Sequence, residues 1–149
     1  MENSKSVAVL GGGSFGTVLA NLAASNGYNV SLWVRDSEQA LRINSEGANT
    51  TYHPELKLSK NIIASDNLKE VLNNKSIIFI ATPSIVFEQI VIRVSDYIDE
   101  KPYLVSCTKG ILDDPFRPLS DIISSKLNNT IGVLSLSLIH ISEPTRLQD

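Results

Sequence analysis

The chain has 149 residues, of which 42% are hydrophobic and 19% charged, and its formal net charge is -3. This length and composition are typical of one globular domain and exclude a disordered tail. Without a basic excess to bind a phosphate backbone, we expect no nucleic-acid partner. The apolar run before Gly11 is too short for a signal peptide or a membrane span, and a single cysteine, Cys107, cannot form an internal disulfide. We therefore expect a cytoplasmic protein.

Short apolar runs alternate with amphipathic stretches along the chain, as is typical of α/β folds. The pattern predicts strands at residues 7–10, 29–34, 62–64, 76–81, 103–106 and 130–134. It predicts helices at residues 15–26, 37–44, 66–72, 86–98 and 119–127. Because strands connected through helices run parallel with right-handed crossovers, the expected fold is a doubly wound parallel sheet.

Two residues mark predicted helix ends, and one stretch has no regular pattern. Gly27 follows the first helix, where a left-handed residue is usually needed. Ser37 is the expected N-cap of the second helix. The polar residues 45–61 predict a long irregular loop, and such loops in compact domains are often functional.

A glycine-rich turn lies between the first predicted strand and the first predicted helix. Its sequence, Gly-Gly-Gly-Ser-Phe-Gly at residues 11–16, contains the pattern Gly-x-Gly-x-x-Gly. In this position Gly11 would permit the tight turn, Gly13 a close approach to a pyrophosphate, and Gly16 close packing of the helix. The helix N-terminus would attract the phosphates. The turn therefore predicts a Rossmann-type dinucleotide-binding domain, and the competing interpretation is a merely structural turn.

The end of the second strand bears on which dinucleotide is bound. An acid at this point usually holds the ribose hydroxyls of NAD, but by position the residue is Val34. Arg35 follows and suits a 2′-phosphate, which favours NADP. Asp36 could still reach a ribose, so NAD stays open. The competing interpretation of Arg35 is a solvated loop charge.

Several motifs occur in the order found in one enzyme family. They are the turn Gly-Gly-Gly-Ser-Phe-Gly-Thr-Val-Leu-Ala, then Leu32-Trp33 with Arg35, Asn44, Tyr52-His53-Pro54, Leu58, Asn61-Ile62, Ala81-Thr82-Pro83-Ser84, the stretch Ser-Cys-Thr-Lys-Gly-Ile from Ser106, and Val133-Leu134-Ser135. Over residues 7 to 135 the chain resembles the N-terminal domain of the NAD(P)-dependent sn-glycerol-3-phosphate dehydrogenases.

The resemblance implies reduction of dihydroxyacetone phosphate to sn-glycerol 3-phosphate, a phospholipid precursor. It implies that Ser14 and Phe15 contact the cofactor and that Arg35 meets its adenosine end. Lys109 would lie near the nicotinamide and the substrate phosphate, where an ammonium group suits a dianion or a developing oxyanion. Without the resemblance, Lys109 reads as an exposed loop lysine. The full-length enzyme is expected to act on a small-molecule substrate as a homodimer.

Other residues are open to more than one interpretation. Pro83 and Ser84 either line the nicotinamide pocket or simply begin a helix. Cys107 is either a reactive thiol or, as we favour, a buried thiol at a strand end. Tyr52 either covers the cofactor or anchors its loop. His53 has no companion ligands at metal spacing, so we expect no metal site.

The chain departs from the family pattern after Ser135. Residues 136–146 match an in-frame translation of a transposon-end adapter used in DNA library preparation, so we expect residues 1–135 to be the domain and 136–149 a non-native tail. The C-terminal helical domain, which in the family carries the catalytic lysine, is absent, so this chain itself should lack turnover. Two alternatives stay open: another dehydrogenase, such as ketopantoate reductase or a relative of 6-phosphogluconate dehydrogenase, and a non-enzymatic nucleotide-sensing module.

Overall fold

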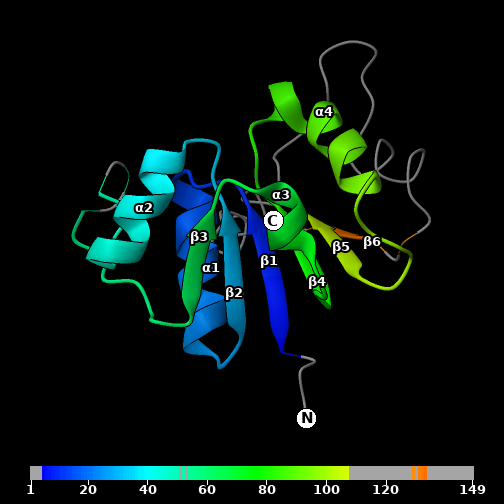
Figure 1. The fold of residues 1–149 in the computed structure, drawn as a ribbon. Coiled ribbons are helices and arrows are strands. Elements are labelled where there is room, and N and C mark those ends of the chain that lie inside the picture. Colours follow the sequence, from blue (N-terminus) through cyan, green and yellow to red (C-terminus); the bar gives the residue numbers. More distant parts are fainter. Residues whose placement is uncertain (1–4, 51, 53, 108–128, 130, 134–149) are drawn as a thin grey trace, which may run out of the picture.

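The computed structural model describes residues 5–50, 52, 54–107, 129 and 131–133. Six parallel strands form one sheet in the order β3-β2-β1-β4-β5-β6 (Figure 1). The strands are β1 (Ser6–Leu10), β2 (Asn29–Trp33), β3 (Ile62–Ser65), β4 (Ile77–Ile80), β5 (Tyr103–Ser106) and β6 (Ile131–Val133). The helices are α1 (Ser14–Ser25), α2 (Ser37–Glu46), α3 (Leu68–Leu72) and α4 (Ser84–Ser95). This order confirms the predicted doubly wound Rossmann-type sheet.

The strands are in register at their carboxyl ends. Leu10 of β1 pairs with Trp33 of β2 on one side and with Ile80 of β4 on the other. The backbone N–H of Gly11 donates to the carbonyl of Trp33 at 2.9 Å, and that of Ala81 donates to Leu10 at 2.8 Å. The segments that leave β1, β2 and β4 therefore begin side by side, at the point where the strand order reverses and ligands bind in such folds.

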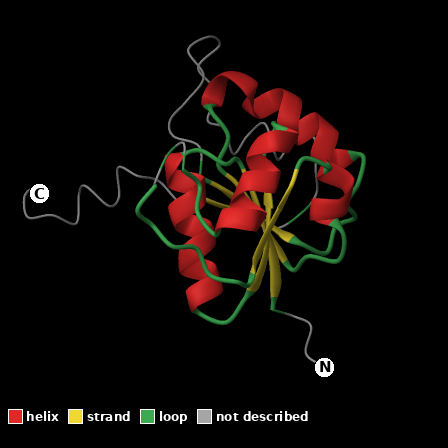
Figure 2. Ribbon diagram, turned by 60° about the vertical axis from the view of Figure 1, so that its left-hand side comes forward, coloured by secondary structure: helices red, strands yellow, loops and turns green. Residues whose placement is uncertain are grey.

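Helices pack on both faces of the sheet, so its central strands β1 and β4 are apolar apart from Ser6. In β1, Ala8 and Leu10 pack in a cluster with α3 and α4, whereas Val7 and Val9 pack in a second cluster with α1 and α2. Figure 2 shows the helices (red) on both sides of the strands (yellow). In the part of the chain that the structure describes, no helix is long and apolar enough to cross a membrane.

The helix ends agree only partly with the predictions. Gly27 has a φ of +94°, as predicted, and the N–H groups of Gly27 and Tyr28 bond to the carbonyls of the last turn of α1. The prediction that Ser37 is the N-cap of α2 was wrong. The Asp36 side chain caps α2 by accepting from the N–H of Glu38 at 3.0 Å. The carboxylate precedes the helix in extended backbone and so faces its first N–H groups.

Helices α3 and α4 also begin elsewhere than predicted. The Asn67 side chain accepts from the N–H of Glu70 at 3.1 Å, so α3 begins at Leu68. Helix α4 begins at Ser84, directly after Pro83, and ends at Ser95. It stops short of residue 98 because the last turn tightens to bonds that span three residues. The predicted helix at 119–127 lies outside the described residues.

The last turns of α2 are tied to the edge of the sheet by the side chain of Asn44. Helix α2 extends two residues past its predicted end, to Glu46, and Gly47 follows with a φ of +69°. The Asn44 amide donates to the carbonyl of Ala64 at 2.9 Å and accepts from its N–H at 2.8 Å. These two bonds occupy the backbone of the outermost strand, β3, and thereby protect one sheet edge.

Candidate functional site

A cleft of about 910 Å³ lies at the carboxyl edge of the sheet. Its walls are the glycine turn and the start of α1, the end of β2, the segment that joins β4 to α4, and one face of α4. Figure 1 shows these segments at the end of the sheet opposite the N-terminus. Of the predicted cofactor residues, the cleft is lined by Gly11, Gly13, Ser14, Phe15, Gly16, Arg35, Asp36 and Pro83. Lys109 lies outside the described residues.

Three glycines shape the turn in different ways. Gly11 has a φ of +122°, and a Cβ there would lie 2.7 Å from the carbonyl oxygen of Ala81. A Cβ on Gly16 would overlap the carbonyl oxygen of Gly11. At Gly13, by contrast, a Cβ would meet nothing within 4 Å. The first two glycines therefore close the turn against β4 and α1, and Gly13 leaves the space beside the start of α1 open. This is the space that a pyrophosphate needs at a helix N-terminus.

A polar network of Thr17, Gln39 and the buried Asn49 holds the turn. Asn49 is 1% exposed, and its Nδ2 donates to the Gly12 carbonyl at 2.7 Å and to Thr17 Oγ1 at 2.8 Å. Thr17 Oγ1 donates to the Gly13 carbonyl at 2.7 Å. Gln39 Nε2 donates to the Gly12 carbonyl and to Asn49 Oδ1, both at 3.2 Å. Carbonyls of the turn thus accept bonds from side chains of α1, α2 and the loop that follows α2.

Sequence reasoning missed this network. Asn49 lies in the predicted irregular loop, 37 residues from Gly12 and 32 from Thr17. A polar residue in a polar loop gives no sign of burial. The available signal was a threonine in the first turn of α1, where a hydroxyl can bond back to the preceding backbone.

The residues that follow β2 differ in their exposure. Val34 is 1% exposed, and a Cβ on Gly12 would overlap its Cγ1, so Val34 supports the turn from below. Arg35 and Asp36 are exposed and line the cleft. Asp36 also caps α2, so one oxygen of the carboxylate already accepts a bond from the backbone.

Trp33 and Arg93 form a contact at the cleft that the sequence analysis did not anticipate. Trp33 is 3% exposed, and its Nε1 donates to the carbonyl of Asp66 at 3.0 Å. The Arg93 guanidinium carbon lies 5.6 Å from the centroid of the Trp33 ring. In α4, Val86, Gln89, Ile90 and Arg93 share the face that lines the cleft, at helical spacing.

The remaining candidates have different surroundings. Ser84 and Tyr52 line the cleft, and the Tyr52 side chain is 49% exposed. Cys107 also lines the cleft but is 3% exposed, and burial raises the pKa of its thiol to about 12. It is therefore a buried thiol, not a reactive one. His53 lies outside the described residues, among which no three potential metal ligands lie together.

The strand order, the glycine turn and the cleft together define a Rossmann-type domain. A family model described as "NAD-dependent glycerol-3-phosphate dehydrogenase N-terminus" matches residues 6–137. The chain therefore belongs to the family of N-terminal domains of NAD-dependent glycerol-3-phosphate dehydrogenases.

Individual relatives agree with this family. The chain is 42% identical over 135 residues to a glycerol-3-phosphate dehydrogenase [NAD(P)+] of Alcanivorax borkumensis, covering 90% of this chain and 39% of the relative. It is 43% identical over 130 residues to that of Acinetobacter baylyi, covering 87% of this chain and 36% of the relative. The crystal structure of glycerol-3-phosphate dehydrogenase from Coxiella burnetii superposes with a TM-score of 0.80 at 31% identity, covering 86% of this chain and 39% of that one. The chain thus spans about two fifths of the length of these relatives.

One more distant structure has the same fold. A ketopantoate reductase from Ralstonia eutropha superposes with a TM-score of 0.70 at 15% identity, covering 86% of this chain and 40% of that one. At this identity the likeness shows the fold alone.

Proposed function

We propose that this chain is the cofactor-binding domain of an enzyme that transfers hydride between NAD(P)H and dihydroxyacetone phosphate, giving sn-glycerol 3-phosphate. The observation that carries the proposal is the glycine turn at the carboxyl edge of the sheet, with its open space at Gly13. The family to which the chain belongs is named for glycerol-3-phosphate dehydrogenase. The nicotinamide supplies the hydride when it is bound, and the protein orients the reactants and excludes water.

The glycine turn is the proposed site of the pyrophosphate. Gly11 and Gly16 keep the turn compact, and Gly13 allows the phosphates to approach the backbone. Ser14 and Phe15 begin α1, where the positive end of the helix dipole favours an anion. Residues 11–16 therefore bind the part of the cofactor that NAD and NADP share.

Arg35 is the proposed contact to the adenosine 2′-phosphate, so NADPH is the favoured cofactor. Arg35 is exposed at the cleft, whereas Asp36 is engaged as the cap of α2. Replacing Arg35 with Ala should weaken NADPH binding about tenfold, or ~1.4 kcal/mol, and NADH binding less than threefold. Calorimetric titration of both nucleotides checks this, with Arg42→Ala as control because Arg42 lies outside the cleft. Equal losses for the two nucleotides would contradict the assignment of Arg35.

The substrate side of the proposed site combines two described residues with others that lie outside the described part of the chain. Pro83 and Ser84 are proposed to line the nicotinamide pocket, and Lys109 to contact the nicotinamide and the substrate phosphate. The family members that match are more than twice as long as this chain, and we propose that their additional region completes the substrate pocket. The 149 residues alone should then bind a dinucleotide without turning over substrate. Assembly as a homodimer and a cytoplasmic location are further parts of the proposal.

Substrate specificity tests the proposal directly. The full product of the gene is assayed by oxidation of NADPH and of NADH with dihydroxyacetone phosphate, and in parallel with ketopantoate. We expect turnover with dihydroxyacetone phosphate and none with ketopantoate. Turnover with ketopantoate alone would identify a different dehydrogenase. Nucleotide binding without turnover of either compound by the full product would instead identify a nucleotide-sensing module.

A further inference from the structure

The Arg93 guanidinium is held over an immobilised aromatic ring at the rim of the cleft. Trp33 is fixed by its burial and by the bond from its Nε1 to Asp66. Arg93 reaches the ring from α4, and both residues line the cleft. A guanidinium group in a cation–π contact with an aromatic ring keeps its N–H donors available for a planar or tetrahedral anion. The contact therefore orients a cation without neutralising it.

Arg35 and Arg93 line the same cleft. Side chains alternate between faces along a strand, and Trp33 packs with the α3–α4 cluster whereas Val34 packs with the α1–α2 cluster. The backbone of Val34 still bonds to the neighbouring strand, since its N–H donates to the carbonyl of Ser65 at 3.0 Å. Continued past the end of β2 at Trp33, this alternation directs Arg35 toward the face on which Arg93 lies over Trp33.

The charges of the cleft favour a dianion. Among the described residues that line it, the charged ones are two arginines, Arg35 and Arg93, and one acid, Asp36. Asp36 accepts one backbone bond at Oδ1 as the cap of α2, and it is the single negative charge among these residues. Two guanidinium groups against one carboxylate leave a net positive charge, which suits a phosphate monoester better than a diol.

We propose that Arg93, oriented by Trp33, is a second cationic residue of the site for the adenosine 2′-phosphate and so helps to determine preference for NADPH over NADH. The inference rests on the proposed dinucleotide-binding function and deepens it. Arg93 is not a catalytic residue, because the adenosine end of the cofactor lies far from the reacting carbon. Its effect should appear in the binding of one cofactor and not of the other.

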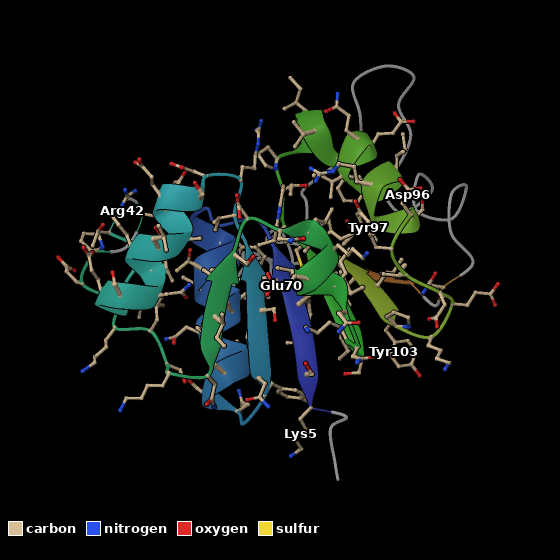
Figure 3. All side chains as sticks on the ribbon, viewed as in Figure 1. Lys5, Arg42, Glu70, Asp96, Tyr97 and Tyr103 are labelled. Atoms are coloured by element: carbon tan, nitrogen blue, oxygen red, sulfur yellow. The ribbon has the colours of Figure 1, made fainter. Side chains whose placement is uncertain are left out.

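The test compares the two nucleotides on the full product of the gene by calorimetric titration. Arg93→Gln should raise the Kd of NADPH about tenfold, equal to ~1.4 kcal/mol, and that of NADH less than twofold. Arg93→Lys keeps the charge but loses the planar fork, so the Kd of NADPH should rise about threefold. Arg42→Gln is the matched control, because Arg42 lies on α2 and outside the cleft (Figure 3). It should leave both Kd values unchanged.

Two outcomes would overturn this inference while leaving the proposed function intact. Equal weakening of NADPH and NADH would mean that Arg93 contacts a part that both share, such as the adenine ring, or that it supports the fold. Unchanged binding would mean that it contacts neither. If Arg93→Gln does not fold, the ratio of the Kd of NADPH to the Kd of NADH for Arg93→Lys tests the inference. A ratio equal to that of the unaltered protein would overturn it. Failure of the unaltered protein to bind either nucleotide would refute the proposed function itself.

The same variants allow a spectroscopic check that does not need a cofactor. Trp33 is the single tryptophan of the 149 residues. If the guanidinium lies over its ring in solution, Arg93→Gln should change the indole emission of the 149-residue chain without cofactor, and Arg42→Gln should not. An unchanged emission spectrum would contradict the contact on which the inference depends.

Discussion

Removing the Asn49 side chain should destabilise the domain and loosen the glycine turn together. The amide makes three hydrogen bonds, to the Gly12 carbonyl at 2.7 Å, to Thr17 Oγ1 at 2.8 Å and from Gln39 at 3.2 Å. At about 1 kcal/mol for each bond in a buried network, Asn49→Ala should cost about 3 kcal/mol. That is a large share of the roughly 5–15 kcal/mol by which a typical domain is stable.

Urea denaturation measures this cost, and titration with NADPH measures the effect on the site. Because the Gly12 carbonyl would retain only the longer bonds from Gln39 at 3.2 Å and Thr17 at 3.4 Å, we expect the Kd of NADPH to rise by about fivefold, equal to ~1 kcal/mol. Asn61→Ala is the control, since Asn61 is exposed near the end of the same loop, and it should change stability by less than about 0.5 kcal/mol. If the two variants had equal midpoints, the network would not support the turn, and the reasoning would be wrong.

Two further predictions separate stability from binding and fix one pH dependence. Gly13→Ala should leave the urea midpoint nearly unchanged, since its Cβ meets nothing within 4 Å, yet weaken NADPH binding by at least about tenfold, or ~1.4 kcal/mol. Gly16→Ala should lower both the urea midpoint and the affinity for NADPH, because its Cβ would overlap the Gly11 carbonyl. Equal urea midpoints for the two variants would contradict the roles assigned to the two glycines. The pKa of the Cys107 thiol is raised from 9.0 to about 12, so its contribution to folding is complete below pH 9 and is lost as the pH rises toward 12. The stability difference between the unaltered protein and Cys107→Ala, measured in urea, should therefore shrink by about 1.4 kcal/mol between pH 7 and pH 10, and a constant difference would refute the burial effect.

The fold was predictable because its strongest features are local and periodic. The apolar strands, the glycine turn and Gly27 each depend on residues within a few positions of one another. The helix starts were less predictable, since Asp36 and Ser37 are both good caps and the choice depends on where β2 releases the chain.

The candidate site was predictable where sequence spacing alone fixes geometry. The turn at residues 11–16 and the position of Arg35 after β2 follow from the strand and helix that flank them. Asn49 and Arg93 could not be found this way, because each acts through a partner more than thirty residues away. Only the packed sheet brings α4 over Trp33, and helical spacing by itself gives Arg93 no more meaning than any exposed arginine.

The cleft is assembled from segments that are remote in the chain and that meet only when β1, β2 and β4 are paired at their carboxyl ends. A nascent chain that has emerged only as far as α2 lacks the wall formed by residues 81–93, so the complete cleft forms only after β4 has paired with β1. Bound nucleotide then contacts segments that follow several strands and stabilises their pairing. At a free concentration one hundred times its Kd it would add about 2.7 kcal/mol to the stability of the fold. Cellular cofactor supply would in this way help to set how much of the domain survives proteolysis.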